Sequence, residues 1–423
     1  MRILLATSPE KSIFLYLVPM MWALRTAGHE VRVASQPRFA DTITQSGLTA
    51  VPVGRDRDPW RITADMPEER ERGRKGLPAP YDAFDDYERA TWEYLEPELA
   101  NAVQGWHWLT SFPLIAGLTE YARQWEPDLI IWEPLCFAGP IAAKASGAAH
   151  ARMLFGVDVW GPTREHFLRR REEQPPEART DPFADWLGSY ARKYGGEFSE
   201  DMVTGHFTID QFPLSLSVEA AGLNYLRTQY IPYGGTAVVP DWLQRPAERP
   251  RVALTLGLTA TEIFNGYNVP LSDILGSLSE LDIEVVATVA DSERHKLGTL
   301  PGNVRIVSYV PWHAIVPTCS AVVHHAGAAT LATTARHPVP QLALHYHHDQ
   351  PTLARKLAEQ GAGLEIHTTQ VTGDGVRDAV ARLLTEPRFT ERAAALRDEM
   401  FALPSPNEAV AQLEELTTKH RSR

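Results

Sequence analysis

Short apolar segments alternate with helix-length segments along most of the chain. In the first half the apolar segments span residues 3–6, 31–34, 128–132 and 151–155. The pattern restarts in the second half at residues 251–257 and continues at 284–289, 304–307, 321–325 and 341–345. Strands that are apolar on both faces and separated by helices are typical of a parallel sheet covered on both sides. The pattern therefore predicts an α/β protein with two doubly wound, Rossmann-like domains.

A segment rich in proline and glycine marks the boundary between the two domains. It includes Tyr230-Ile231-Pro232-Tyr233-Gly234-Gly235 and Arg245-Pro246-Ala247-Glu248-Arg249-Pro250. Because prolines and glycines at this density disfavour both helix and sheet, we predict a linker at residues 216–250 between domains at 1–215 and 251–400.

The end of the chain, residues 401–423, predicts one more helix. Ser405 suits the N-cap and Pro406 the first helical position, while Glu408 completes a capping box.

An unbroken apolar run at residues 13–24 follows Arg2 and resembles the hydrophobic region of a signal peptide. It is too short to span a bilayer, which needs about 20 residues. The preceding segment 2–7 predicts a buried strand that would feed a helix formed by the run. We therefore interpret the run as a core helix and expect no membrane association.

Composition narrows the function classes. The 423 residues contain 41 Lys and Arg against 53 Asp and Glu, a formal net charge of −12, with 44% apolar residues. This is an ordinary soluble composition, and the acidic balance argues against nucleic-acid binding, which depends on basic residues that neutralise phosphates. The two cysteines, Cys136 and Cys319, form no CxxC motif, so a reducing cytoplasm fits and a disulfide framework does not.

Two charged segments, residues 55–90 and 164–196, interrupt the alternation. Each is interpreted either as a solvated surface insertion or as a substrate or partner loop, because long connections in compact α/β domains are often functional.

The sequence His324-His325-Ala326-Gly327-Ala328-Ala329-Thr330 follows a strand and opens a helix. Its small residues let backbone N–H groups and a helix N-terminus approach an anion, and His325 and Thr330 can donate hydrogen bonds to phosphate. The alternative is a tight turn that needs small residues for packing. A GxGxxG motif is absent from the sequence, which disfavours a dehydrogenase.

The next predicted strand ends in His345-Tyr346-His347-His348-Asp349-Gln350. Ligands bind at the strand ends of open α/β sheets, and Asp349 with Gln350 would suit a polyhydroxylated ligand. A metal site built from His345, His347, His348 and Asp349 is the less favoured alternative, because adjacent side chains on an extended strand alternate faces.

The two motifs together resemble the donor signature of nucleotide-sugar glycosyltransferases of the GT-B fold. The resemblance covers nearly the whole chain and is closest to actinobacterial transferases that attach deoxysugars, often amino sugars, to macrolide and anthracycline aglycones. Further matching segments are residues 22–37, Trp132-Glu133-Pro134, Thr208-Ile209-Asp210, Val239-Pro240-Asp241-Trp242-Leu243 and Leu254-Thr255-Leu256-Gly257.

The resemblance implies an acceptor-binding first domain and a second domain that holds a dTDP-sugar in the cleft between them. His325, Gly327 and Thr330 would meet the pyrophosphate, and Asp349 and Gln350 the sugar hydroxyls. Tyr309 would stack on the nucleobase and the Val310 backbone would face the base edge, unless Tyr309 is a core aromatic. The rest of the expected donor site is Thr255, Gly257 and Ala328.

The sequence departs from these relatives at two places. Ala326 and Ala329 stand where glycine is usual, although alanine disfavours positive φ. In the acceptor loop at Ser12 and Ile13, the relatives carry a histidine base at the position of Ile13. We expect Glu133, after the strand at 128–132, to replace that base, since burial could raise its pKa from about 4.3. A capping role for Glu133 is the alternative, and Asp158 is the second candidate base.

These features predict an inverting, metal-independent glycosyltransferase without a cofactor, which moves a deoxysugar from a dTDP-sugar to a hydrophobic aglycone. A metal-dependent alternative would use the DxD triplet Asp56-Arg57-Asp58. A non-enzymatic alternative is a sugar-nucleotide-binding accessory subunit that lost its base at Ile13. The resemblance also implies an auxiliary protein similar to a cytochrome without haem.

Overall fold

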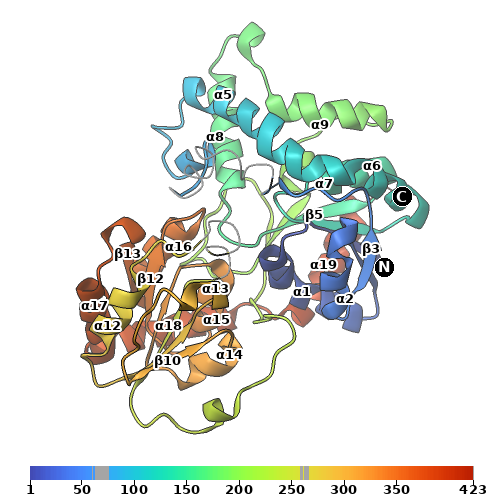
Figure 1. Ribbon diagram of the computed structural model, residues 1–423. Coiled ribbons are helices and arrows are strands. Elements are labelled where there is room, and N and C mark those ends of the chain that lie inside the picture. The colour runs from blue at the N-terminus through green and yellow to red at the C-terminus, as the bar shows by residue number, and fades with distance from the viewer. Residues whose placement is uncertain (60, 62–75, 258–260, 262–265, 423) are drawn as a thin grey trace.

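The computed structural model describes residues 1–59, 61, 76–257, 261 and 266–422, which form two α/β domains (Figure 1). The sheet of the first domain has the strand order β3-β2-β1-β4-β5-β6-β7, and that of the second has the order β10-β9-β8-β11-β12-β13. Neighbouring strands are parallel throughout both sheets. The predicted pair of doubly wound domains is confirmed.

The strands predicted from apolar runs are all present, with ends shifted by at most a few residues. The first sheet contains β1 (Arg2–Ala6), β2 (Glu30–Ser35), β3 (Thr49–Pro52), β4 (Leu129–Trp132), β5 (Ala149–Met153), β6 (Phe207–Asp210) and β7 (Tyr225–Arg227). The second contains β8 (Arg251–Thr255), β9 (Glu284–Thr288), β10 (Val304–Val307), β11 (Ala321–His324), β12 (Gln341–His345) and β13 (Gly363–His367).

The α-helices cover both faces of the two sheets. Those of the first domain are α1 (Lys11–Thr26), α2 (Ala40–Gln45), α5 (Trp92–Ala102), α6 (Trp108–Trp125), α7 (Ala138–Ser146), α8 (Trp160–Glu172), α9 (Pro182–Lys193) and α10 (Asp201–Thr204). The later ones are α12 (Leu271–Leu278), α13 (Asp291–Arg294), α14 (Trp312–Ile315), α15 (Ala328–Ala335), α16 (Gln350–Gln360), α17 (Gly373–Thr385), α18 (Pro387–Ala402) and α19 (Pro406–His420).

The apolar run at residues 13–24 lies within helix α1. It packs in the main core of the first domain, where Phe14, Leu17, Val18 and Leu24 are fully buried. The run is therefore a core helix, as predicted. Among the described residues, no helix combines the length and the apolar composition needed to cross a bilayer.

The linker is shorter than predicted, because β7 lies inside residues 216–250 and pairs with β6. This three-residue edge strand carries too few apolar positions for its pattern to be read from the sequence. The chain then crosses to the second domain after Arg227 and crosses back near Pro404. The backbone N–H of Gln229 and the hydroxyl of Thr228 both donate to the carbonyl of Pro404, at 2.8 and 3.0 Å. The two crossings are thus joined.

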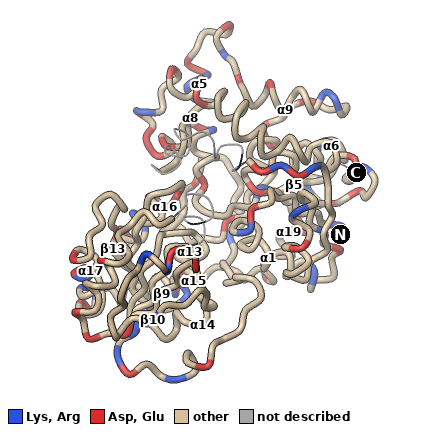
Figure 2. Tube along the Cα trace, in the orientation of Figure 1, with Lys and Arg blue, Asp and Glu red and all other residues tan. Residues whose placement is uncertain are grey.

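The last helix, α19, returns to the first domain and packs against α1, β5 and β7 (Figure 1). It begins with the predicted capping box, in which Ser405 and Glu408 each accept a hydrogen bond from the other's backbone N–H. Basic and acidic residues are interspersed over both domains (Figure 2).

The strand order decides where a ligand can bind. In each sheet the chain winds to one side of the first strand and then to the other, so a crevice opens at the carboxyl ends of β1 and β4, and of β8 and β11. The residues that follow these four strands include most of the predicted site.

Candidate active site

A single cavity of about 1500 Å³ lies between the two domains. Its lining includes all of the predicted donor-binding residues and both residues of the predicted acceptor loop: Ser12, Ile13, Thr255, Gly257, Tyr309, Val310, His325, Gly327, Ala328, Thr330, Asp349 and Gln350. Glu133 and Asp158 are not among the lining residues. The residues predicted for the donor and the acceptor loop therefore lie together on one cavity, whereas the two predicted bases do not line it.

The N-terminus of α15 opens into this cavity. The first hydrogen bond of this helix runs from the Leu331 N–H to the Gly327 carbonyl, so the preceding N–H groups have no partner within the helix. Gly327 offers no side-chain cap, and the first turn contains no acidic residue. The free N–H groups and the helix dipole together favour an anion at this position.

The His325 ring is clamped between two glycines beside this helix terminus. A Cβ atom on Gly257 would lie 2.6 Å from Cε1 of His325, and one on Gly327 would lie 2.3 Å from its Nε2. Burial lowers the pKa of His325 to about 4, so the ring is neutral at pH 7. Its Nδ1 atom is buried, and the ring lies beside the Thr255 backbone, whose hydrogen bonding opposes part of this lowering of the pKa. A neutral ring in this position can donate one hydrogen bond to a ligand.

The alanine at position 326 adopts the conformation that the sequence analysis questioned. Ala326 has a φ of 61° and is fully buried. Its N–H donates to Nδ1 of His324 at 2.9 Å, and Nε2 of His324 contacts Oε1 of Gln341 at 2.8 Å. These hydrogen bonds hold the strained residue in place. Ala329 lies in α15 and needs no positive φ.

Tyr309 is 52% exposed and lies on the cavity wall, so the alternative of a core aromatic is wrong. A Cβ on Gly234 would lie 3.2 Å from its hydroxyl, which places the linker beside the ring. Val310 is buried and packs in a small core cluster with Ile315 and Val316. An exposed aromatic face anchored by a buried neighbour is suited to stacking on a planar ligand.

Asp349 connects the two domains. Its Oδ2 atom accepts a hydrogen bond from the Val157 N–H at 3.0 Å, and a Cβ on Gly156 would lie 2.0 Å from the same oxygen. The loop after β5 therefore fits this carboxylate only because it carries glycine. The neighbouring Gln350 accepts hydrogen bonds from the N–H groups of Tyr346 and His347 through Oε1, which fixes its side chain at the start of α16.

The first domain contributes an aromatic wall to the cavity. Part of the charged segment 55–90 takes part, since residues 76–89 supply several lining side chains, which favours the substrate-loop interpretation for this part. The aromatic residues of the wall are Tyr81, Phe84, Trp106, Trp108, Phe155 and Trp160. The other charged segment, 164–196, folds largely into α8 and α9.

Glu133 is fully buried and holds two loops together. Its Oε1 accepts hydrogen bonds from the N–H and the hydroxyl of Ser8, at 3.0 and 2.7 Å, and its Oε2 accepts one from the Leu135 N–H at 2.7 Å. Burial raises its pKa, as expected. However, the carboxylate is enclosed by the loops after β1 and β4, so a substrate in the cavity cannot reach it. The capping alternative describes Glu133 better than a catalytic one.

Asp158 is also buried and structural. It forms a 2.5 Å ion pair with Arg152, and it accepts hydrogen bonds from the Tyr225 hydroxyl at 2.8 Å and the Gly161 N–H at 2.9 Å. This network anchors the start of α8. We therefore correct both assignments: neither predicted base is placed for proton transfer.

Of the alternative metal ligands, His347, His348 and Asp349 line the cavity, whereas His345 and the two aspartates of the DxD triplet are not among its lining residues. Asp56 accepts a hydrogen bond from the Arg38 N–H and Asp58 pairs with the Arg38 side chain at 3.1 Å, outside the cavity lining. His345 pairs with Glu365 at 2.6 Å. Among the described residues, neither the DxD triplet nor the histidine cluster brings three potential ligand atoms together.

Within the described residues, the only group of three potential metal ligands is His150, Asp201 and His206. Nδ1 of His150 accepts a hydrogen bond from Nε1 of Trp132 at 3.2 Å, and Nδ1 of His206 accepts one from the His150 N–H at 3.1 Å. Both neutral rings therefore carry their proton on Nε2, which faces Asp201. This arrangement is a hydrogen-bond network in the first domain, away from the cavity.

Comparison with known families explains the site. Residues 22–257 match the N-terminal domain of the family described as erythromycin biosynthesis protein CIII-like, and residues 272–416 match its C-terminal domain. The chain belongs to this family. It is a GT-B glycosyltransferase, and we refer to it below as the CIII-like transferase.

Its relatives act in antibiotic biosynthesis. The CIII-like transferase is 44% identical to the 10-deoxymethynolide desosaminyltransferase of Streptomyces venezuelae, over 100% of this chain and 98% of that protein. It is 42% identical to the aclacinomycin-T 2-deoxy-L-fucose transferase of Streptomyces galilaeus, over 100% and 97%. Its structure resembles that of the glycosyltransferase VinC in complex with dTDP, with a TM-score of 0.89 and 40% identity over 99% and 100% of the two chains.

Sequence reasoning missed Glu10 and Tyr16, which also line the cavity. Tyr16 could have been found from helical spacing, because it lies three residues after Ile13 on α1. Glu10 is the residue just before this helix, where helical spacing gives no signal.

The close packing of Gly257 and Gly327 against the His325 ring should make stability sensitive to a larger residue at either position. Gly327→Ala should lower the free energy of unfolding of the CIII-like transferase by about 1–3 kcal/mol, because the new Cβ forces the His325 ring to move. The control is Gly276→Ala in α12, where a Cβ would meet nothing within 4 Å; it should raise stability by about 0.5–1 kcal/mol. Urea unfolding measures both. Equal changes in the two variants would contradict the clamp.

The buried neutral histidines should make the free energy of unfolding depend on pH. Burial lowers the pKa of His107 and of His324 to about 3, against about 6.5 in the unfolded chain. Below pH 6.5 the unfolded state binds protons that the folded state does not, so each histidine lowers stability as pH falls, by up to about 1.4 kcal/mol per unit. His324→Gln should therefore show a shallower pH dependence than the wild type between pH 6.5 and 4. If urea unfolding gives the wild type and His324→Gln the same dependence of the free energy of unfolding on pH, His324 is not neutral in the folded state.

Proposed function

We propose that the CIII-like transferase moves a deoxysugar, preferentially an amino sugar, from a dTDP-sugar to a macrolide- or anthracycline-like aglycone, with inversion and without a metal. One observation carries the proposal: an uncapped helix N-terminus, a clamped neutral histidine and a strand-end carboxylate meet an aromatic wall in one interdomain cavity. The two free cysteines are compatible with a reducing compartment, which supports a cytoplasmic location as part of this proposal.

The donor half of the cavity supports a nucleoside diphosphate sugar. The N-terminus of α15 and His325 offer hydrogen-bond donors to the two phosphates, and the exposed ring of Tyr309 offers a stacking surface for the base. Asp349 and Gln350, which also line the cavity, would bind the sugar. The similarity to VinC, solved with dTDP, supports thymidine as the nucleoside.

An excess of carboxylates supports a cationic substituent on the sugar or the aglycone. The charged side chains that line the described part of the cavity are Glu10, Asp82, Asp85, Glu98 and Asp349 against Arg89 and Arg355. Both arginines are already paired, Arg89 with Asp82 and Arg355 with Asp85. The excess of acidic over basic side chains in the described lining would attract an ammonium group. The desosaminyltransferase relative acts with an amino sugar by name.

The acceptor half supports a large hydrophobic aglycone. Its aromatic wall provides apolar area for burial, and Tyr81 and Trp160 lie with ring centroids 6.3 Å apart on one side of the cavity. A cavity of about 1500 Å³ exceeds the few hundred Å³ that a small substrate requires. It has room for a macrolactone beside the donor.

The mechanism that fits this arrangement is a direct displacement. An acceptor hydroxyl from the first-domain side attacks the anomeric carbon while the diphosphate leaves toward the second domain, which inverts the configuration. The N–H groups of α15 and His325 would stabilise the charge that develops on the leaving diphosphate, the role that a cation has in metal-dependent transferases. The accessory-subunit alternative is not favoured, because the named relatives are transferases.

Transfer by the purified protein tests the proposal. Incubation with dTDP-desosamine and 10-deoxymethynolide, with and without an auxiliary protein resembling a haem-less cytochrome, should yield a product heavier by one sugar in mass spectrometry. Failure with all tested donors and acceptors, despite dTDP binding, would contradict the enzymatic assignment.

Substitution of Asp349 distinguishes binding of the sugar from binding of the nucleotide. Asp349→Ala should reduce kcat/KM for transfer by about 10–100-fold, the cost of one charged hydrogen bond, while calorimetry shows nearly unchanged affinity for dTDP. Asp349→Asn can still accept the Val157 N–H, so it serves as the control for the interdomain contact. Equal losses of affinity for dTDP and dTDP-sugar would contradict the assignment.

A further inference from the structure

We propose that Tyr230 is a positioning residue that fixes helix α15, whose N-terminus would hold the donor phosphates, against helix α1 of the acceptor domain. This inference rests on the proposed function, and it concerns a residue outside the predicted donor site and acceptor loop. It follows from a stack of Tyr230 on α1, from its contacts with α15, and from its place where the chain crosses between the domains.

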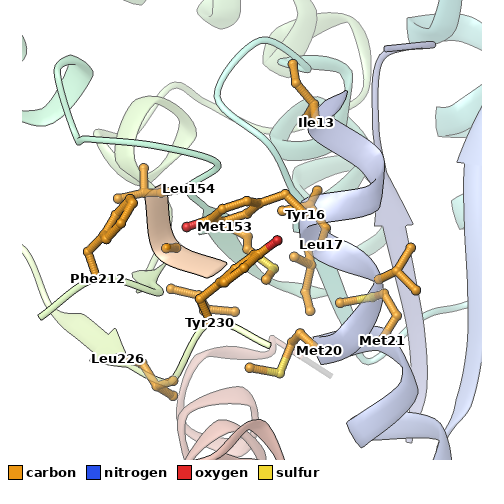
Figure 3. Packing of buried hydrophobic residues seen from close by; sticks show 14 of the residues in the cluster. Ile13, Tyr16, Leu17, Met20, Met21, Met153, Leu154, Phe212, Leu226 and Tyr230 are labelled. Atoms are coloured by element: carbon orange, nitrogen blue, oxygen red, sulfur yellow. The ribbon is translucent and has the colours of Figure 1, made fainter. Parts of the chain in front are cut away.

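The Tyr230 ring stacks on the first domain. It lies against the ring of Tyr16 in α1, with a centroid distance of 4.7 Å and an angle of 28° between the ring planes. Both residues are buried, and Figure 3 shows the two rings one above the other, with Tyr16 one turn after Ile13 of the acceptor loop. Because a buried aromatic stack in a close-packed core resists sliding, the stack fixes Tyr230 relative to this loop.

Tyr230 also contacts the last turn of α15 in the second domain. Its carbonyl accepts a hydrogen bond from Nη1 of Arg336, the residue that follows α15, at 2.9 Å. Burial raises the pKa of Tyr230 to about 12, and the Thr333 side chain and the Tyr233 backbone oppose part of this rise, so both lie close to the hydroxyl. The backbone and the side chain of one residue therefore hold the end of α15.

Helix α15 carries this position to the proposed anion site. It has eight residues, so its two ends lie about 12 Å apart at a rise of about 1.5 Å per residue. Its middle is packed, since Leu331 and Ala332 are fully buried in the same apolar cluster as Tyr16 and Tyr230. A short helix packed in this way moves as one body, so a displacement of its last turn displaces its N-terminus in the cavity.

The backbone beside Tyr230 is held at the crossing between the domains. The preceding residue, Gln229, donates from Nε2 to the Leu403 carbonyl at 2.7 Å and accepts from Arg336 through Oε1 at 3.2 Å. The Arg336 guanidinium lies over the Phe401 ring, 4.4 Å from its centroid. One arginine thus joins the end of α15 to both chain crossings, next to Tyr230.

A direct contact with substrate explains Tyr230 less well than positioning does. Tyr230 lines the cavity, but it is only 1% exposed, and Tyr16 covers one face of its ring. Tyr309, which is 52% exposed, offers a far larger aromatic surface to a ligand in the same cavity. The contacts of Tyr230 are therefore mainly with the two helices.

The proposed displacement depends on the distance between these helices. The acceptor oxygen, the anomeric carbon and the leaving oxygen must lie in line, and the acceptor and the donor are assigned to different domains. A misplacement of about 1 Å can reduce a rate by about 10²-fold. Tyr230 fixes the α1–α15 distance through its stack on Tyr16 and its contacts with Thr333 and Arg336.

Substitution of Tyr230 tests the assignment. Tyr230→Leu should lower kcat for transfer by about 10–100-fold, while calorimetry gives a nearly unchanged affinity for dTDP, because the proposed nucleotide contacts belong to the second domain. Tyr230→Phe keeps the stack and the carbonyl contact, so it should recover most of the rate. The control is Tyr121→Leu, which removes a tyrosine stacked on Trp125 outside the described cavity lining and should turn over like the wild type.

The distance between the domains is a second measurement, and it requires no activity. Spin labels at Glu120→Cys in α6 and Asp378→Cys in α17, two exposed positions, report this distance in a Cys319→Ala background. Tyr230→Leu should shift or broaden the distance distribution, whereas Tyr230→Phe should leave it unchanged. An inactive wild type would contradict the proposed function, and the distance distributions would still test the role of Tyr230.

A wild-type kcat for Tyr230→Leu would overturn the inference, as would an unchanged distance distribution. A loss of dTDP affinity as large as the loss of kcat would also overturn it, since Tyr230 would then belong to the nucleotide site. If Tyr230→Leu does not fold, Arg336→Met replaces it, because this variant loses the hydrogen bond to the Tyr230 carbonyl and keeps the buried ring. A lower kcat of Arg336→Met at unchanged dTDP affinity would support the inference, and a wild-type kcat would overturn it.

Discussion

The structure depends on one unsatisfied feature: the free N–H groups at the N-terminus of α15, which open into the cleft between the domains. A buried helix end without a cap is costly unless a ligand or water satisfies it. The surrounding residues keep it accessible. His324 holds Ala326 at positive φ, and Gly257 and Gly327 leave the space that the His325 ring occupies. Each of these residues helps to keep the start of α15 open to the cavity.

The two sheets bring the rest of the chemistry to that site. Both have their crevice at the carboxyl ends of the central strands, and the domains face each other across one cavity. Contacts cross this cavity, including the Asp349 carboxylate on the Val157 N–H and the pair of Arg355 with Asp85. The chain crosses between the domains twice, and Thr228 and Gln229 join the two crossings at Pro404. The two domains are thus joined both at the paired chain crossings and by contacts across the cavity.

Features that depend on residues close together in the sequence were predictable, whereas features that depend on packing between distant segments were not. The second-domain lining of the cavity was predictable because each of its motifs follows a strand directly, so that His325 and Asp349 reach the cavity from the ends of their strands. The base was not, because Glu133 follows the correct strand but is covered by the loop that carries Ser8, and loop packing leaves no periodic signal. Edge strands such as β7 and β13 were missed for a related reason: half-exposed strands mix polar and apolar residues and are short.

The central claim is that the α15 terminus and His325 bind a nucleoside diphosphate, and thermal unfolding with dTDP tests it most directly. At a dTDP concentration of about 100 times Kd, binding should stabilise the wild type by about 2.7 kcal/mol, and thymidine at the same concentration should stabilise it much less, since it lacks the phosphates. His325→Ala should reduce the shift produced by dTDP. An unshifted wild-type transition at saturating dTDP, or equal shifts with dTDP and thymidine, would contradict the account.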